Sequence, residues 1–140
     1  MDNKEKIKII TTQYSEDDKE TIIVDTEAEI TGTENNYTIT YLETQGDMAG
    51  EKTTVRVRDG KKITISRRNA ILSSLIIIEK DIRHITHYSN SGVSFNMGMS
   101  CSELESDFSG GRLYFRYETD MDLVPMGEIE FEFIFRKTEV

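Results

Sequence analysis

The stretch LIIIEKDIRHITHYSNSGVSFNMGMS, residues 75–100, decides the fold class. Near its end every second residue is apolar: Val93, Phe95, Met97 and Met99. This two-residue period is typical of a strand with one buried face. Polar breaks at Lys80-Asp81 and at Asn90-Ser91-Gly92 predict tight turns between the apolar runs. The stretch therefore predicts consecutive β-strands.

The same period extends over most of the chain, and Asp59-Gly60 is the strongest hairpin signal in it. Residues expected on buried faces are Ile7, Ile9, Ile22, Val24, Ala28, Ile30, Tyr37, Ile39, Tyr41, Val55, Val57, Ile63, Ile65, Leu113, Phe115, Tyr117, Met121, Leu123, Ile129, Phe131, Phe133 and Phe135. Ser102–Ser109 lacks the alternation and predicts a loop or one helical turn. Pro125 predicts that a strand ends at Val124–Gly127, because proline cannot donate to a β-ladder.

No helical pattern separates these runs, so a parallel sheet is not expected. About nine or ten strands with short connections indicate an antiparallel sheet, either a closed barrel or a sandwich. Long strands in meander order favour the barrel, which has no exposed edges. We therefore predict one all-β domain over residues 1–140, an antiparallel meander barrel of about 8–10 strands.

Composition excludes several classes of function. The net charge of -9 repels phosphate groups, so neither nucleic acid nor an anionic membrane surface is an expected partner. Cys101 is the single cysteine, which rules out an internal disulfide. The longest aliphatic run, Leu75–Ile78, is far shorter than the roughly 20 residues of a membrane span. Met1–Lys6 does not begin a secretory signal, so we expect a cytoplasmic protein.

One pattern around the opening stretch resembles a known family. It consists of Glu79-Lys80-Asp81-Ile82-Arg83-His84, then Tyr88, Gly92 and Met97-Gly98. These residues resemble the YwiB-like family of small uncharacterised bacterial proteins, which have lipocalin-like (calycin) β-barrels. The resemblance covers Lys6 to Arg136. It departs at Asp81, where the family has glycine, and at Ser89–Gly92, which replaces a proline-containing turn. The resemblance implies a bacterial, lipocalin-like barrel with a lumen. The family has no assigned activity, so the resemblance implies nothing about a substrate.

Several polar residues continue otherwise apolar faces. Glu43 follows Tyr41 in parity, Arg67 follows Ile65, and His84 shares parity with Tyr88. In a lipocalin-like barrel such residues line a lumen for a small amphipathic or apolar ligand and orient a carboxylate or similar head group. The predicted lining is Tyr41, Glu43, Arg67, Arg83, His84, Tyr88, Phe95, Met97, Phe115 and Phe133. The alternative is that Glu43 and Arg67 lie beyond the barrel rim, in solvent.

Two other functions stay open. The run Ile71–Ile78 is apolar on both strand faces, which favours a homodimer or another protein-interaction module. An enzyme using Glu43, Arg83 and His84 ranks last, because no nucleophile, metal-ligand set or cofactor loop accompanies these residues. We therefore expect no catalytic residue and no cofactor.

The remaining reactive residues have plainer interpretations. His84 and His87 point to opposite sides of a strand, so they do not form a metal site. Cys101 has no histidine partner at a recognisable spacing and is expected to be a buried, inert thiol. The glutamates of the last strand are expected to pair with Arg112 and Arg116 on a solvated face.

Overall fold

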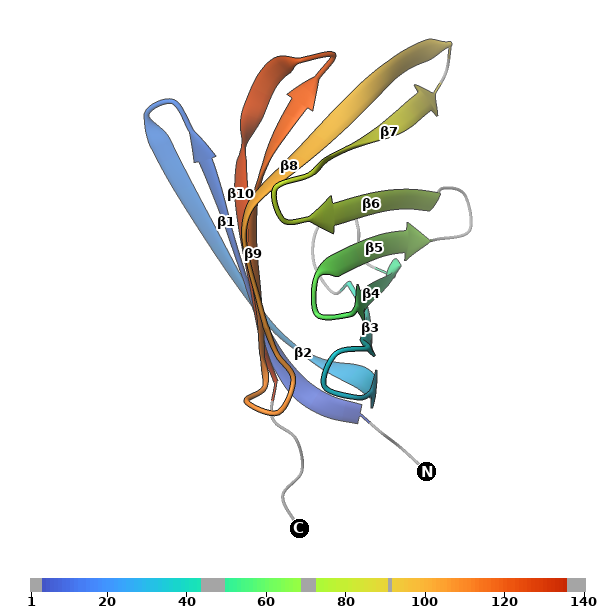
Figure 1. Ribbon diagram of the computed structural model, residues 1–140, viewed down its shortest axis with the longest axis vertical. Helices are drawn as coiled ribbons and strands as arrows, with labels where there is room; N and C mark the ends of the chain where they lie inside the picture. The colour runs from blue at the N-terminus through green and yellow to red at the C-terminus, as the bar shows by residue number, and fades with distance from the viewer. Residues whose placement is uncertain (1–3, 44–49, 69–72, 91, 136–140) are drawn as a thin grey trace.

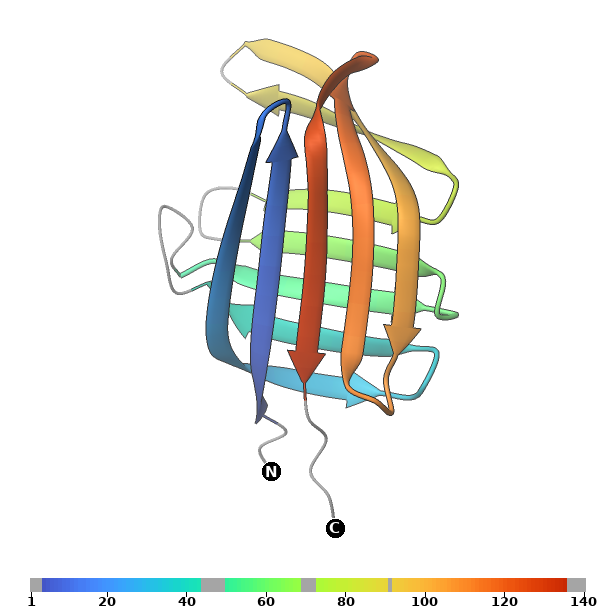
Figure 2. The same ribbon diagram turned by 90° about the vertical axis from the view of Figure 1, so that its left-hand side faces the viewer.

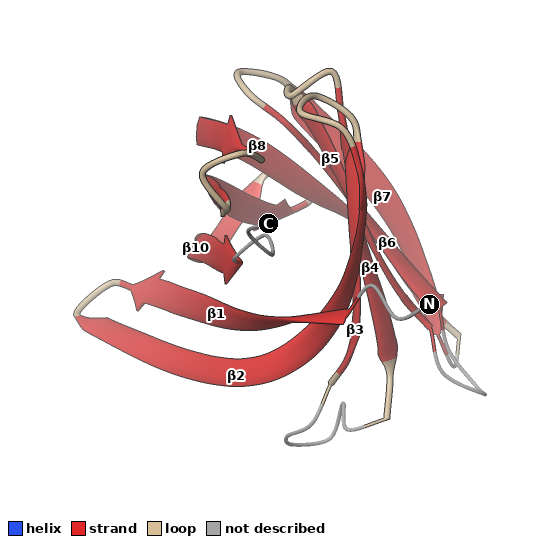
Figure 3. Cartoon of the chain, turned by 90° about the horizontal axis from the view of Figure 1, so that it is seen from below, coloured by secondary structure: helices blue, strands red, loops and turns tan. Residues whose placement is uncertain are grey.

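The computed structural model describes residues 4–43, 50–68, 73–90 and 92–135. Its regular elements are strands throughout (Figures 1 and 3), and none of the described segments is a helix able to cross a membrane. The strands are β1 (Lys4–Ser15), β2 (Asp18–Gly32), β3 (Tyr37–Leu42), β4 (Lys52–Arg58), β5 (Lys62–Arg68), β6 (Ser73–Glu79), β7 (Arg83–Asn90), β8 (Val93–Asp107), β9 (Arg112–Met121) and β10 (Val124–Phe135).

The ten strands form one antiparallel sheet in the order β6-β5-β4-β3-β2-β1-β10-β9-β8-β7. The first and last strands of the chain pair in its middle, with Ile7 opposite Phe135 and Tyr14 opposite Glu128. The sheet curls until β6 and β7 meet, and the long strands run steeply across the short ones (Figure 2). The result is a nearly closed barrel. This confirms the predicted all-β antiparallel meander and its strand number.

The barrel closes incompletely at the seam between β6 and β7. Backbone pairing there is the isolated bridge between Glu79 and Ile82. Farther along the seam the Thr86 hydroxyl donates to the Leu75 carbonyl at 3.3 Å, and His84 Nε2 lies 3.0 Å from Glu79 Oε1. Side chains thus bridge the seam where a backbone ladder would otherwise continue.

The core lies on the inner face, in cross-strand rows fixed by the register of β3 to β6. One row pairs Tyr37, Val57, Ile63 and Ile78, and the next pairs Ile39, Val55, Ile65 and Ile76. Phe115 and Phe133 pack opposite these rows and are fully buried. Each such side chain contributes about 1.5–3 kcal/mol through burial. The alternation read from the sequence is confirmed for these strands.

One end of the barrel, which we call the closed end, is sealed by three turns, residues 33–36, 59–61 and 108–111, packed around Tyr37, Phe108 and Phe135. The rings of Tyr37 and Phe108 are 4.7 Å apart. Glu34 Oε2 accepts the Phe108 N–H at 2.9 Å, and the Asn35 carbonyl accepts the Gly60 N–H at 2.8 Å. The three turns are therefore held together by direct hydrogen bonds. Positive φ values at Asp59 (54°) and Gly60 (64°) confirm the predicted hairpin turn.

The prediction of a loop or helical turn at Ser102–Ser109 is wrong for most of that segment. Strand β8 continues to Asp107, with a bulge between Cys101 and Glu103. The bulge adds one residue and so shifts the inward parity: Met99 and Cys101 point inward before it, and Leu104 and Phe108 after it. A search for a constant two-residue period misses such a strand, because the inward-facing positions change from odd to even numbers at the bulge.

The prediction that Val124–Gly127 ends a strand is also wrong. The turn is at Asp122-Leu123, where φ is 49° and 76°, and β10 begins at Val124. Pro125 is tolerated within β10 because β1 stops pairing with β10 at Glu128.

The tips of the β1–β2 and β9–β10 hairpins extend beyond the core and splay apart (Figure 1). Ile22 is 46% exposed and Leu123 is 74% exposed, so their expected burial is corrected. Both residues lie on the same strand face as buried residues, but they are in the parts of the two hairpins that extend past the core and are not covered by it. In β6, Ile76 and Ile78 point inward and Leu75 is exposed, while Ile71 and Leu72 lie outside the described residues.

Candidate functional site

A polar row follows the two apolar rows on the inner face of β3 to β5. The register places Tyr41 opposite Thr53 and Thr53 opposite Arg67. Tyr41 and Thr53 are buried, with exposed fractions of 5% and 0%. Each member of this row lies two residues from an inward-facing apolar residue of its own strand, which is Ile39, Val55 or Ile65. Because side chains alternate between the two faces of a strand, Tyr41, Thr53 and Arg67 also face inward. We call Tyr41, Glu43, Thr53 and Arg67 the polar site.

Glu43 is positioned by its backbone. Its N–H donates to the Glu51 carbonyl and its own carbonyl accepts the Gly50 N–H, both at 2.9 Å, which extends the β3–β4 pairing by one step. The Thr53 hydroxyl then donates to Glu43 Oε2 at 2.7 Å. The Glu43 carboxylate is therefore held against the inner face.

Arg67 and Glu43 are brought together although the chain separates them widely. Arg67 Nε lies 3.9 Å from Glu43 Oε2, and the two side chains are 23% and 19% exposed. They are largely shielded from solvent, unlike two side chains beyond a rim. At 3.9 Å the contact is an ion pair without a hydrogen bond.

The Nε–H of Arg67 is buried and has no hydrogen-bond acceptor among the described residues. Leaving a buried donor unsatisfied costs about 1–3 kcal/mol. Structures seldom retain such a group without a reason, and a missing ligand is one such reason. The guanidinium is thus free to bind an acceptor atom that the described residues do not supply.

Tyr41 gives the site a neutral hydroxyl and an aromatic wall. Burial raises the pKa of Tyr41 well above its usual value, the Glu43 carboxylate raises it further, and Arg67 partly opposes them. The phenol therefore keeps its proton at physiological pH and can donate. The rings of Tyr41 and Phe133 are 6.4 Å apart, and Phe133 lies 6.2 Å from Phe115. An apolar floor adjoins the polar groups.

The other apolar residues of the predicted lining lie in or beside the core. Phe115 and Phe133 are fully buried, Met97 packs against the core from β8, and Phe95 is half-buried. The Tyr88 side chain lies outside the described residues, although its backbone pairs with that of Phe95.

Arg83 and His84 are not part of the polar site. Arg83 pairs with Asp120 through two hydrogen bonds of 3.0 and 2.6 Å, on the opposite strand face from His84. His84 binds Glu79, which pairs with Lys62 at the start of β5, whereas Arg67 is near its end. The structure therefore does not bring together the enzyme trio of Glu43, Arg83 and His84.

The Arg83–Asp120 pair passes over β8 at Gly98. A Cβ atom on Gly98 would lie 2.5 Å from Arg83 Nε and 2.5 Å from Asp120 Oδ2, so the absent side chain makes room for the pair. Arg83 holds the pKa of Asp120 below its usual value, helped by the Leu123 N–H. The pair ties β7 to β9 on the outer surface.

The outer face of β1, β10 and β9 carries the charge pairing expected from the sequence. Arg112 Nε lies 2.6 Å from Glu132, and Arg116 bonds Glu128. The hydroxyls of Tyr14 and Tyr114 both donate to Glu130. The bond from Tyr114, then the one from Tyr14, lowers the pKa of Glu130. These charged and hydroxyl groups cover the outer face of the sheet and bond one another.

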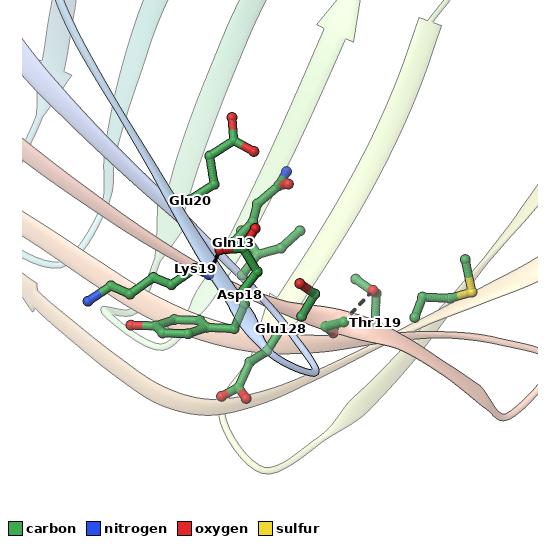
Figure 4. Close-up of a pocket in the computed structure, with 11 residues that line it drawn as sticks. Gln13, Asp18, Lys19, Glu20, Thr119 and Glu128 are labelled. Atoms are coloured by element: carbon green, nitrogen blue, oxygen red, sulfur yellow. Dashed lines mark hydrogen bonds between the residues drawn. The ribbon is translucent and has the colours of Figure 1, made fainter.

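Among the clefts that open on the surface, two lie beside features described above. One, of about 480 Å³, forms where β2 leaves β3 beyond the Ala28–Tyr41 pair, and it reaches Tyr41 between outward residues such as Glu27 and Leu42. The other, of about 240 Å³, lies between the two splayed hairpins. Figure 4 shows Gln13 and Glu20 pointing to one side of this second cleft and Glu128 to the other. The first cleft borders the polar site only at Tyr41, since Glu43, Thr53 and Arg67 are not among the residues that line it.

Sequence reasoning missed Thr53 as a partner of Glu43 and Asp120 as a partner of Arg83. Thr53 was visible as a polar residue at an inward position, followed by Val55 and Val57. No sequence pattern marked Asp120 as a partner of Arg83, because the two residues meet only through the strand order β9-β8-β7.

Comparisons with known proteins agree with this fold. A family model described as "Domain of unknown function (DUF1934)" matches residues 7–133. The crystal structure of the ywiB protein from Bacillus subtilis is similar with a TM-score of 0.69 and 17% identity, covering 98% of this chain and 96% of that one. The comparison with curated proteins found no match. The predicted family resemblance is confirmed.

Proposed function

The chain belongs to the DUF1934 family, a domain of unknown function, and we propose that its barrel binds a small amphipathic molecule. The polar head group of this ligand meets Arg67 and Glu43, and its apolar part lies along Tyr41 and Phe133. The observation that carries the proposal is the buried Nε–H of Arg67, which lacks an acceptor among the described residues.

The surroundings of Arg67 support a binding role over a purely structural one. A purely structural arginine would be expected to bond a carboxylate directly, as Arg112 on the outer face bonds Glu132 at 2.6 Å. Arg67 instead stays 3.9 Å from Glu43, whose carboxylate is engaged by Thr53. Ligand sites typically combine such a few fixed polar groups with an apolar wall.

Native mass spectrometry of the protein purified from its own host tests the proposal. We expect wild type to retain a small molecule, and Arg67→Met to lose it. Arg56→Met is the matched control, because Arg56 is an exposed arginine of the neighbouring strand. Equal retention by Arg67→Met would contradict the site, and an unliganded wild type that also binds no added amphiphile would contradict the function.

A second candidate function is self-association. It is favoured by the exposed apolar side chains at the β9–β10 tip, where Leu123, Val124 and Met126 are 74%, 62% and 55% exposed. A second copy of the chain would cover them. Light scattering at micromolar concentration tests this: a dimer that Leu123→Asp converts to a monomer supports it, and a monomeric wild type removes it.

A further inference from the structure

The polar site presents two opposite charges side by side. Thr53 fixes the Glu43 carboxylate, and the 3.9 Å separation from Arg67 Nε is too long for a hydrogen bond. A carboxylate offers about four acceptor positions, so Glu43 keeps capacity after it accepts the hydrogen bond from Thr53. Arg67 Nε–H keeps its donor. Each charge can therefore still bind a group of its own.

Among the described residues, carboxylates outnumber cations on this part of the inner face. Glu5 pairs with Ala28, which pairs with Tyr41, so Glu5 shares the face and the row of Arg67. Glu51 lies opposite Glu43 on the neighbouring strand. The chain as a whole carries a net charge of -9. A head group that brings only a negative charge would add repulsion where burial already penalises charge.

We propose that the ligand has a zwitterionic head group, an ammonium beside a carboxylate, as in an α-amino acid with an apolar side chain. Its carboxylate accepts the Nε–H of Arg67, and its ammonium donates to the carboxylate of Glu43. The head group then neutralises both members of the pair without adding net charge to the interior. This inference rests on the proposed function and specifies the class of ligand.

The test compares four probes that share one hydrocarbon chain length: octanoate, octylamine, octanamide and α-aminooctanoic acid. Isothermal titration calorimetry below micellar concentrations gives the affinity of each. For wild type we expect α-aminooctanoic acid to bind tightest, by about tenfold over the singly charged probes, because each charged hydrogen bond is worth about 1.5–3 kcal/mol. Octanamide, with a weaker donor and acceptor, should fall between them.

Two substitutions should redirect the preference. Glu43→Gln removes the group that binds ammonium, so octanoate should gain about tenfold relative to α-aminooctanoic acid. Arg67→Gln should shift the preference to octylamine by a similar factor. Arg56→Gln, on the outer face of β4, should leave the wild-type order intact. Circular dichroism melting verifies that each variant folds.

The failures are distinguishable. Octanoate or octylamine binding tightest to wild type would overturn the zwitterion while leaving a binding barrel. So would an affinity ratio of octanoate to α-aminooctanoic acid that Glu43→Gln does not change. Absence of binding by all four probes would overturn the proposed function as well.

Discussion

The two ends of strands β3 to β5 differ sharply although the same three strands build both. At the closed end the inner row is Tyr37, Val57 and Ile63, each at most 2% exposed, and the turns beyond it bind one another. At the polar site the inner row is Tyr41, Thr53 and Arg67, with Glu43 beyond it and a donor left unsatisfied. The comparison sets an end whose turns bind one another against an end that, under the proposed function, is kept available for a ligand.

Removing a core side chain should have the largest effect on stability. Phe115→Ala deletes a fully buried ring that stacks on Phe131 at 5.3 Å, and we expect a loss of about 3–5 kcal/mol in the free energy of unfolding. Leu123→Ala, at an exposed tip, should change it by less than about 0.5 kcal/mol. Urea denaturation measures the free energy of unfolding of both variants. Similar losses in the two would contradict the difference expected between a core residue and a tip residue.

Breaking the contact between turns should cost less. Glu34→Gln weakens the acceptor for the Phe108 N–H, so we expect a loss of about 1 kcal/mol in the free energy of unfolding. Glu29→Gln, an exposed glutamate of β2, is the control and should be neutral. If both variants unfold at the same urea concentration as wild type, the closed end does not depend on this contact.

At the polar site, substitution should spare stability and abolish binding. Arg67→Met keeps the length of the side chain, gives up a weak ion pair and removes an unsatisfied donor, so the free energy of unfolding should change by no more than about 1 kcal/mol. A loss comparable to that of Phe115→Ala would mean that Arg67 is a structural residue, contrary to the comparison.

The smallest effect is expected at the Arg83–Asp120 pair. Because the folded-state pKa of Asp120 is lowered, its contribution to stability is present above the unfolded pKa of about 4 and is lost as pH falls through the folded value. Gly98→Ala inserts a Cβ between the partners and should return the pKa of Asp120 toward its ordinary value. Carboxyl NMR titration reports this pKa, and an unchanged value in the variant would show that the pair survives.

The sequence predicted the barrel because a two-residue period survives in strands such as β3, β4 and β5. It failed where geometry broke the period: the bulge after Cys101 exchanges the faces of β8, and Asp122-Leu123 turns without glycine. Parity also placed Glu43 and Arg67 inside but could not show that they meet, since that depends on the register across β3, β4 and β5. Adjacent residues such as Arg83 and His84 suggested a joint site, although strand geometry sends them to opposite faces.

The most direct test of the central claim is an amide NMR titration of wild type with α-aminooctanoic acid. The account predicts that resonances of Tyr41, Glu43, Thr53 and Arg67 shift in a saturable way while those of Tyr37, Phe108 and Gly111 at the closed end stay in place. Shifts concentrated at the closed end, or no saturable shift at the polar site, would contradict it.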